Sequence, residues 1–238
     1  ATTAANTAGE LRLGSGSEIV AAVETRQQIL VYTDESLYAM QFLGPPFTFG
    51  VNLVSENITT MGPLSAVAVE DNVFWMGLKE FYVYGGTVQR LPCSVRDFVF
   101  DDFNLLQREK IVAATNTAFS EIWWFYPSAS SDNNDRYVVY NYEQKVWYYG
   151  SLARSFWMDR GIFDNPIAAG PNNYLYTQES GFDDDGSALT AYIESSQLDI
   201  GDGEQFAFIR RMIPDLTFRG STAGSPSANI TIKTRNFP

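Results

Sequence analysis

The stretch NVFWMGLKEFYVYGG, residues 72–86, holds two short apolar and aromatic runs on either side of a tight turn. Val, Phe, Trp and Tyr favour strands, and a turn between two such runs predicts a β-hairpin. A looser copy, QILVYTDESLYAMQF, occupies residues 28–42. The sequence therefore predicts the same hairpin more than once, and the fold must be one that is built from repeated hairpins.

The hairpins are the middle of a longer repeat. Val31, Trp75 and Trp124 fall at equivalent positions, 44 and 49 residues apart. Around them the sequence predicts three sets of strands and a shorter fourth set. The strands are expected at 18–24, 28–33, 36–42 and 43–58; at 64–70, 72–77, 80–86 and 87–100; at 110–116, 121–127 and 136–150; and at 165–180. In the fourth set, Ala169 followed by Tyr174, Leu175 and Tyr176 repeats an order of small and then aromatic residues.

A unit of about 45–50 residues with four antiparallel strands is typical of a blade of a β-propeller. We therefore predict an all-β, β-propeller-like fold, with small residues on the first strand of each blade and aromatic residues packed between blades. A β-sandwich with hairpins of similar length is the alternative. No helix is expected, apart from residues 103–112, which can form a short helix or a linker between blades.

The repeat also predicts the domain organisation. Residues 1–16 are small and polar and are expected to be irregular, and residues 17–186 carry the blades. Residues 187–238 predict longer strands, at 187–201, 205–220 and 228–238, which belong to a further blade or to a second β domain. The sequence starts at ATTAANTAGE, without Met, and we expect it to be a piece of a longer protein.

The amino-acid composition excludes several classes of function. The 238 residues carry a formal net charge of −12, and a chain this acidic repels nucleic-acid phosphates. The sequence contains no His, which excludes Ser-His-Asp and Cys-His catalysis and His-ligated metals. Cys93 is the only cysteine, so an internal disulfide is excluded. No apolar run approaches the ~20 residues of a membrane helix.

Pairs of carboxylates remain as candidate catalytic groups, because some glycosidases hydrolyse their substrates with Asp and Glu alone. The candidate clusters are Asp101 with Asp102, Asp183 to Asp185, and Asp199 with Asp202. Asp183 to Asp185 and Asp199 with Asp202 lie beside Gly or Ser, where acidic residues form turns. We therefore expect no catalytic, cofactor-binding or metal-binding residues. The aromatic residues at 123–126 and 147–149, which include Trp123, Trp124 and Trp147, can instead form a platform for sugars or the core between blades.

Phe47 and Phe49 lie in the Pro- and Gly-rich segment LGPPFTFG, residues 43–50. Two interpretations stay open for them. They either pack inward from an edge strand, or they form a contact between subunits, since aromatic residues are enriched at protein interfaces.

Four segments of the sequence, taken in order, resemble the tail nozzle or hub proteins of short-tailed bacteriophages. The segments are EIVAAVETRQQILVYTDESLYAMQF, PFTF, VAVEDNVFWMG and RYVVYNYEQKVWYYG. This family includes the packaged-DNA stabilisation proteins, and the resemblance covers roughly residues 15–220. It is a likeness of pattern rather than of a catalytic motif, and the members of the family are longer than this chain.

The resemblance implies a virion structural protein without enzymatic activity or cofactor. Copies would form a homo-oligomeric ring, a hexamer, beneath the portal and adaptor proteins. The ring would extend the channel for double-stranded DNA, help to retain and eject the genome, and carry tail fibres or spikes. No insertion into a membrane is expected. The alternative hypothesis is a propeller that binds carbohydrate or hydrolyses glycosides, through Asp101 or Asp102, or through Trp123, Trp124 or Trp147.

Overall fold

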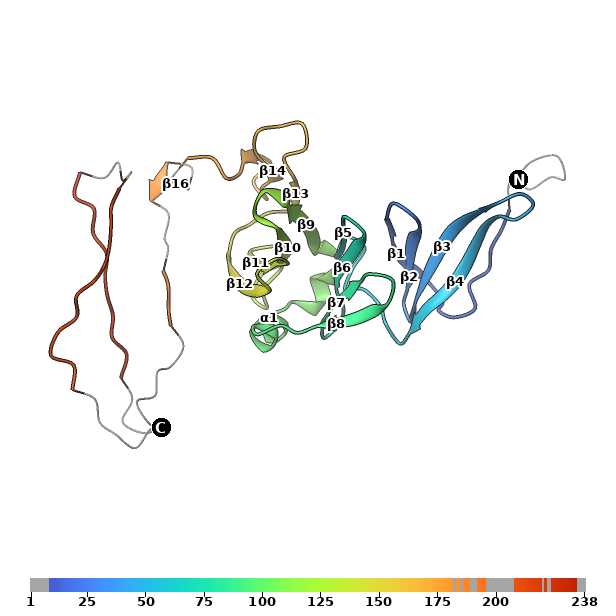
Figure 1. Ribbon diagram of the computed structural model, residues 1–238, viewed down its shortest axis with the longest axis horizontal. Coiled ribbons are helices and arrows are strands. Elements are labelled where there is room, and N and C mark those ends of the chain that lie inside the picture. The colour runs from blue at the N-terminus through green and yellow to red at the C-terminus, as the bar shows by residue number, and fades with distance from the viewer. Residues whose placement is uncertain are drawn as a thin grey trace. The chain divides into compact units, whose positions relative to one another are not determined.

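The computed structural model describes residues 9–181, 183–184, 186–188, 192–195, 208–219, 221 and 224–234. Residue contacts divide the chain into two units, residues 1–181 and 182–238. Most of the strands of the described residues belong to the first unit, which runs from blue to orange in Figure 1.

Three four-stranded antiparallel sheets form from the repeated hairpins. Sheet 1 contains β1 Ile19–Glu24, β2 Ile29–Thr33, β3 Ser36–Gly44 and β4 Thr48–Glu56. Sheet 2 contains β5 Ala66–Val69, β6 Asn72–Met76, β7 Phe81–Tyr84 and β8 Val88–Leu91. Sheet 3 contains β9 Val112–Asn116, β10 Glu121–Tyr126, β11 Arg136–Asn141 and β12 Val146–Ser151. In each sheet the strands lie side by side in chain order, so consecutive strands are antiparallel neighbours. The connections within these sheets are short, except that between β10 and β11, which spans residues 127–135.

The strand register confirms the predicted repeat. Val31 pairs with Ala22 on one side and Tyr38 on the other. The same three-residue ladder recurs as Ala66, Trp75 and Tyr82 in sheet 2, and as Ala113, Trp124 and Val138 in sheet 3. The small residue of each ladder lies on the first strand, as the sequence predicts.

Successive sheets pack face to face, because both faces of the middle sheets are apolar. One buried cluster joins sheets 1 and 2 and includes Tyr32 and Trp75, whose ring centroids are 5.3 Å apart. A second joins sheets 2 and 3 and includes Phe81 and Trp124, 5.0 Å apart. Burying such a side chain contributes about 1.5–3 kcal/mol. The sheets are therefore held together by aromatic packing, since a single blade cannot bury its own faces.

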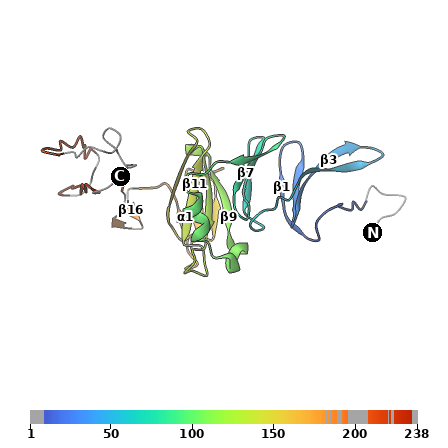
Figure 2. The ribbon, with the colours of Figure 1, turned by 90° about the horizontal axis from the view of Figure 1, so that it is seen from below.

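The first strands β1, β5, β9 and β13 (Phe156–Met158) lie next to one another in this order. They begin at residues 19, 66, 112 and 156, so a new sheet starts every ~45 residues. Figures 1 and 2 show the sheets following one another through the first unit. This is the all-β, propeller-like architecture that the repeat predicts.

A short helix that the sequence analysis missed follows sheet 2. The N-cap residue of helix α1, Arg96–Asp101, is Val95, whose side chain cannot form a capping hydrogen bond, so the usual N-cap signal is absent from the sequence. Tertiary contacts hold it instead: Val99 is fully buried in the cluster between sheets 2 and 3. The expected linker at 103–112 is present as the 3₁₀ turns of η1, Leu105–Lys110, which lead into β9. A third turn, η2, spans Thr117–Phe119.

The fourth sheet differs from its prediction in phase. It contains β13, β14 Ile167–Ala169 and β15 Leu175–Thr177, so Ala169 lies on the second strand and not on the first. The first strand carries Trp157, whose ring centroid is 5.3 Å from that of Trp123. Here the large residue comes first and the small Ala168 is paired with it, which reverses the order of sheets 1 to 3.

The second unit contains the two-residue strands β16 Asp183–Asp184 and β17 Ser187–Ala188. The long strands expected at 205–220 and 228–238 are not assigned where the structure describes these stretches, at 208–219 and 224–234. The described residues there are exposed. An alternating apolar pattern needs a hydrogen-bonded neighbour to become a strand, and the pattern alone does not supply one.

Candidate interaction surface

The β3–β4 hairpin projects as the longest hairpin of the first unit (Figure 1). Each of its strands has nine residues, whereas the other strands of sheets 1 to 4 have three to six. The turn is tight: the amide of Phe47 donates to the carbonyl oxygen of Gly44 at 3.1 Å, and Gly44 has φ +79°, which glycine adopts without strain.

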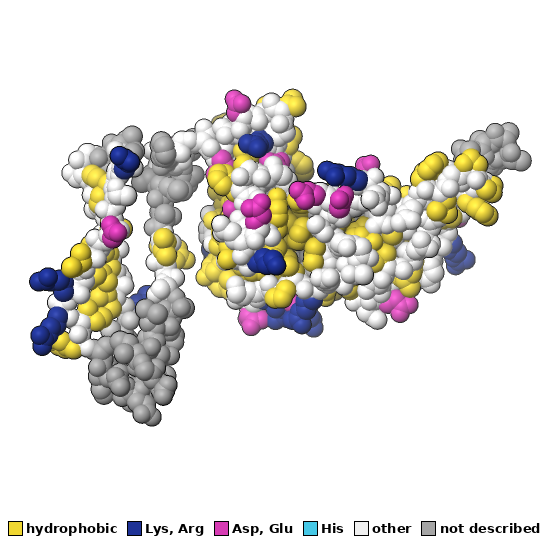
Figure 3. Space-filling model, in the orientation of Figure 1, with side chains coloured by type: hydrophobic (Ala, Val, Ile, Leu, Met, Phe, Trp, Pro, Cys, Tyr) yellow, Lys and Arg dark blue, Asp and Glu magenta, His cyan; other side chains and the backbone are white. Residues whose placement is uncertain are grey.

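Phe47 and Phe49 are exposed at this turn and do not pack inward. Phe47 is 75% exposed and Phe49 44%. Phe49 forms a ring pair with Phe42 across the hairpin, with centroids 5.7 Å apart, and Phe42 is itself 69% exposed. Figure 3 shows hydrophobic side chains gathered at this end of the first unit. We call Phe42, Leu43, Phe47 and Phe49 the hairpin tip.

The hairpin tip leaves a large apolar area in water. Covering a phenylalanine completely is worth about 1.5–3 kcal/mol, so a partner that covered these side chains would gain several kcal/mol before the loss of mobility on binding. Of the two interpretations of Phe47 and Phe49, inward packing is wrong, and an intermolecular contact is the one that the exposure allows.

The described members of the predicted carboxylate clusters take part in an ion pair and in a turn. Asp101 is exposed, and Asp102 forms an ion pair with Arg136, at 3.4 Å between Oδ2 and Nε. Asp183 accepts a hydrogen bond from the amide of Gly186 at 2.9 Å, which is the turn chemistry expected for this position. Asp185, Asp199 and Asp202 lie outside the described residues.

A polar cluster that the sequence analysis missed lies where sheets 3 and 4 meet. Asn116, fully buried at the end of β9, donates through Nδ2 to Glu121 at 3.5 Å and to Glu179 at 3.4 Å. Glu121 also accepts hydrogen bonds from Trp123 Nε1, at 2.9 Å, and from the hydroxyl of Tyr148. Glu179 follows β15, 58 residues after Glu121 in the chain, so no local pattern connects the two carboxylates.

This cluster shifts the protonation of its members. Burial, and then the charge of Glu121, raise the pKa of Glu179 above its usual value. Burial, followed by the bond to Glu121, raises the pKa of the Tyr148 hydroxyl, which therefore stays protonated and continues to donate. The arrangement links the chain after sheet 4 to sheet 3 and supplies a structural contact.

The aromatic residues considered for sugar binding form the core between sheets. Trp123 is 8% exposed, and Trp124 is completely buried. Trp147 packs on Trp124 at 5.9 Å, and its Nε1 donates to the carbonyl oxygen of Pro92 at 2.8 Å. Trp123 and Trp124 therefore offer no open ring face, and the expectation that they fill the space between blades is confirmed.

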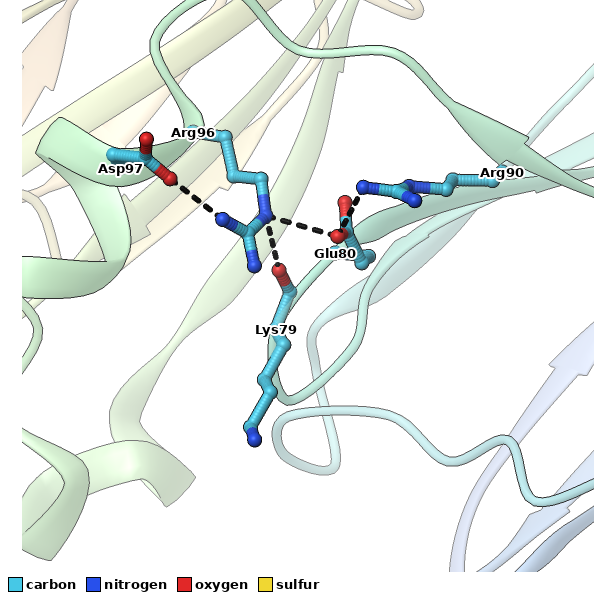
Figure 4. Close-up of polar contacts among 5 residues, drawn as sticks. All are labelled: Lys79, Glu80, Arg90, Arg96 and Asp97. Carbon is cyan, nitrogen blue, oxygen red and sulfur yellow. Dashed lines mark hydrogen bonds and ion pairs between the residues drawn. The ribbon is translucent and has the colours of Figure 1, made fainter.

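Charged residues form a separate network beside α1. Figure 4 shows Glu80 between two arginines: Arg96 Nε lies 2.9 Å from Glu80 Oε1, and Arg90 contacts the same oxygen. Arg96 also donates to the carbonyl oxygen of Lys79 at 2.9 Å and pairs with Asp97. The network connects the β6–β7 turn to the start of α1. It therefore positions this helix, whose N-cap residue makes no side-chain capping bond.

Within the described residues, no three His, Cys, Asp or Glu side chains are grouped closely enough to hold a metal ion. Among the same residues, no helix has the length and apolar composition that a membrane-spanning segment needs.

No protein-family model matches the chain, and no curated protein matches it. Among solved structures, the extracellular domain of a one-component system from B. thetaiotaomicron is similar, with 10% identity over 79% of this chain and a TM-score of 0.47. The WD40 domain of Neurospora crassa Pan2 is similar with 16% identity over 65% of this chain, 44% of its own length and a TM-score of 0.37. The chain spans 24% of the length of the first of these structures. At these identities the likenesses concern the fold alone and identify no family.

Proposed function

We propose that this chain is a structural protein of a virion, a subunit of the tail nozzle ring of a short-tailed bacteriophage. The proposal starts from the resemblance of residues 15–220 to the nozzle or hub proteins. It also draws on the composition, because a chain without His and with a single Cys suits a structural part better than an enzyme.

The observation that carries the proposal is the exposed hairpin tip. Four large exposed apolar side chains at the end of a projecting hairpin are a liability in a protein that acts alone, and they are typical of a surface that another protein covers. In a ring of identical subunits, each hairpin tip would contact the neighbouring copy through a head-to-tail interface that closes by rotation.

The charge of the chain fits a channel through which DNA passes. With a formal net charge of −12, the subunit repels phosphates, so double-stranded DNA would pass without being bound. The ring would lie below the portal and adaptor proteins, extend their channel, help to retain and then eject the genome, and carry tail fibres or spikes. A hexamer is the assembly that the resemblance implies.

Electron microscopy and size-exclusion chromatography with light scattering test this proposal. Rings with a central channel, which also bind a purified portal–adaptor complex, are the expected result. The double variant Phe47→Ser with Phe49→Ser should lose assembly, while the control Leu106→Ser, at a side chain that is 94% exposed outside the hairpin, should assemble like the wild type. If the chain is instead monomeric, binds no tail component and binds sugars on a glycan array, the carbohydrate-binding alternative would replace this proposal.

A further inference from the structure

The free face of sheet 1 has the residue pattern of a buried face. Val31 occupies the position of Trp75 in sheet 2 and of Trp124 in sheet 3, as the three equivalent ladders show. Trp75 and Trp124 are fully buried against the sheet that precedes theirs. Val31 is only partly buried, and the described residues place no sheet against it.

This free face continues as an apolar surface into the hairpin. Because directly paired residues of antiparallel strands share a face, Tyr38 with Leu53, Met40 with Val51 and Phe42 with Phe49 line the same side as Val31. Tyr38 is buried, because the chain at Ser15 lies over it and the Ser15 amide donates to its hydroxyl at 2.6 Å. The exposed part of the face therefore lies toward the β3–β4 turn. Leu53 is 47% exposed and Phe42 69%. The neighbouring residues Leu30, Tyr32 and Leu37 point the other way, into the cluster with sheet 2.

The opposite end of the first unit carries a matching surface. In sheet 4, Trp157 and Ala168 face sheet 3. Their neighbours in the strands therefore face away, and Phe156 and Leu175, both paired with Ala169, are 51% and 76% exposed. Sheet 4 thus presents an apolar face on the side where sheets 1, 2 and 3 each receive the next sheet.

We propose that the free face of sheet 4 in one copy packs on the free face of sheet 1 in a second copy of the chain. Among the described residues of the first unit, the three contacts between sheets follow one rule, in which the face of one sheet receives the opposite face of the next. The two free faces are the remaining pair that obeys this rule. The contact is head-to-tail and joins two different surfaces, so it can repeat from copy to copy.

This inference rests on the proposed function only for the expectation that copies of the chain associate. The proposed contact shares Phe42 and Phe49 with the hairpin tip, but it also uses Leu53 and Leu175, which do not belong to the tip. The continuity of packing also sets the chemistry of the partner: an antiparallel sheet with aliphatic and aromatic side chains, and no charged residue at the centre of the contact.

Two variants and their mixture test the contact. Leu53→Glu disables the face of sheet 1, and Leu175→Glu disables the face of sheet 4, and each should weaken self-association of the full chain about tenfold or more. Light scattering of an equimolar mixture should show dimers and nothing larger, because only one intact pair of faces remains. Leu106→Glu, an equally drastic change at a side chain that is 94% exposed, should leave self-association unchanged. Far-ultraviolet circular dichroism verifies that all variants are folded.

Disulfide cross-linking provides a second measurement. In a Cys93→Ala background, a tagged Leu53→Cys chain should cross-link to an untagged Leu175→Cys chain, and each should cross-link poorly to itself. Cross-linking mainly between two Leu53→Cys chains would overturn the head-to-tail arrangement. Assemblies unaffected by Leu53→Glu and Leu175→Glu would overturn this inference and leave the proposed ring standing. A chain that is monomeric at every concentration would overturn both.

Discussion

Replacing Trp124 by alanine tests whether aromatic packing between sheets stabilises the first unit. The Trp124 side chain is completely buried, with its ring 5.0 Å from Phe81 and 5.9 Å from Trp147. Its Nε1 donates to the carbonyl oxygen of Ser65 at 3.0 Å. Removing a buried Trp from a core costs about 3–5 kcal/mol, because both the transfer free energy and the packing around the cavity are lost.

The magnitude can be divided with a second variant. The Ser65 oxygen also accepts from the amide of Met76 at 3.2 Å, so it keeps a partner when the indole is removed. Trp124→Phe therefore loses one hydrogen bond, at about 0.5–1.5 kcal/mol, and in addition the packing of part of the ring.

Thermal unfolding followed by circular dichroism measures these losses. In a chain of this size, 1 kcal/mol lowers the midpoint by about 2–4 °C, so Trp124→Ala should lower it by about 6–20 °C and Trp124→Phe by much less. Leu106→Ala, at an exposed side chain, serves as the control. If Trp124→Ala unfolds at the wild-type temperature, the sheets are not held together by the cluster that contains Trp124, and the explanation of the fold given above is refuted.

Three other outcomes follow from local features. Lys145 has φ +58° in the β11–β12 turn, a conformation that glycine adopts without strain, so Lys145→Gly should raise the free energy of unfolding by up to about 1 kcal/mol in urea titrations; a loss of stability would contradict this explanation. Burial raises the pKa of the Cys93 thiol to about 11, so iodoacetamide should alkylate it more slowly at pH 8 in the folded chain than in urea, as mass spectrometry would show; equal rates would contradict the assigned burial. Because the pKa of Glu179 is raised in the folded chain, the folded chain holds a proton that the unfolded chain releases, and stability falls as the pH rises through that interval. Glu179→Gln should therefore unfold at a higher temperature than the wild type at pH 7 and lose that advantage below ~pH 4, where both states of the wild type are protonated; an unchanged difference at the two pH values would disprove the linkage.

The candidate contact surface was partly readable in the sequence. The sequence places Phe47 and Phe49 in a Pro- and Gly-rich segment and leaves open whether they pack inward; the position of the β3–β4 hairpin decides that they are exposed. The polar cluster of Asn116, Glu121 and Glu179 is not predictable from the sequence, because Asn116 and Glu121 belong to sheet 3 whereas Glu179 follows sheet 4, far along the chain. The sequence instead indicates Asp101 and Asp102, which are adjacent in the chain; in the structure Asp101 ends helix α1 and Asp102 pairs with Arg136.

Local chemistry determined the strands of sheets 1 to 3 and their register. Alternating apolar residues, short turns and the spacing of Val31, Trp75 and Trp124 are all properties of neighbouring residues, and they were sufficient to predict repeated four-stranded blades. Tertiary structure alone decided the rest. Helix α1 has no capping residue and forms because Val99 is buried and Arg96 meets Glu80. In sheet 4 the large residue lies on the first strand and the small one on the second, because Trp157 packs on Trp123. The number of sheets in succession decides which apolar faces are left uncovered, and no short stretch of the chain encodes that number.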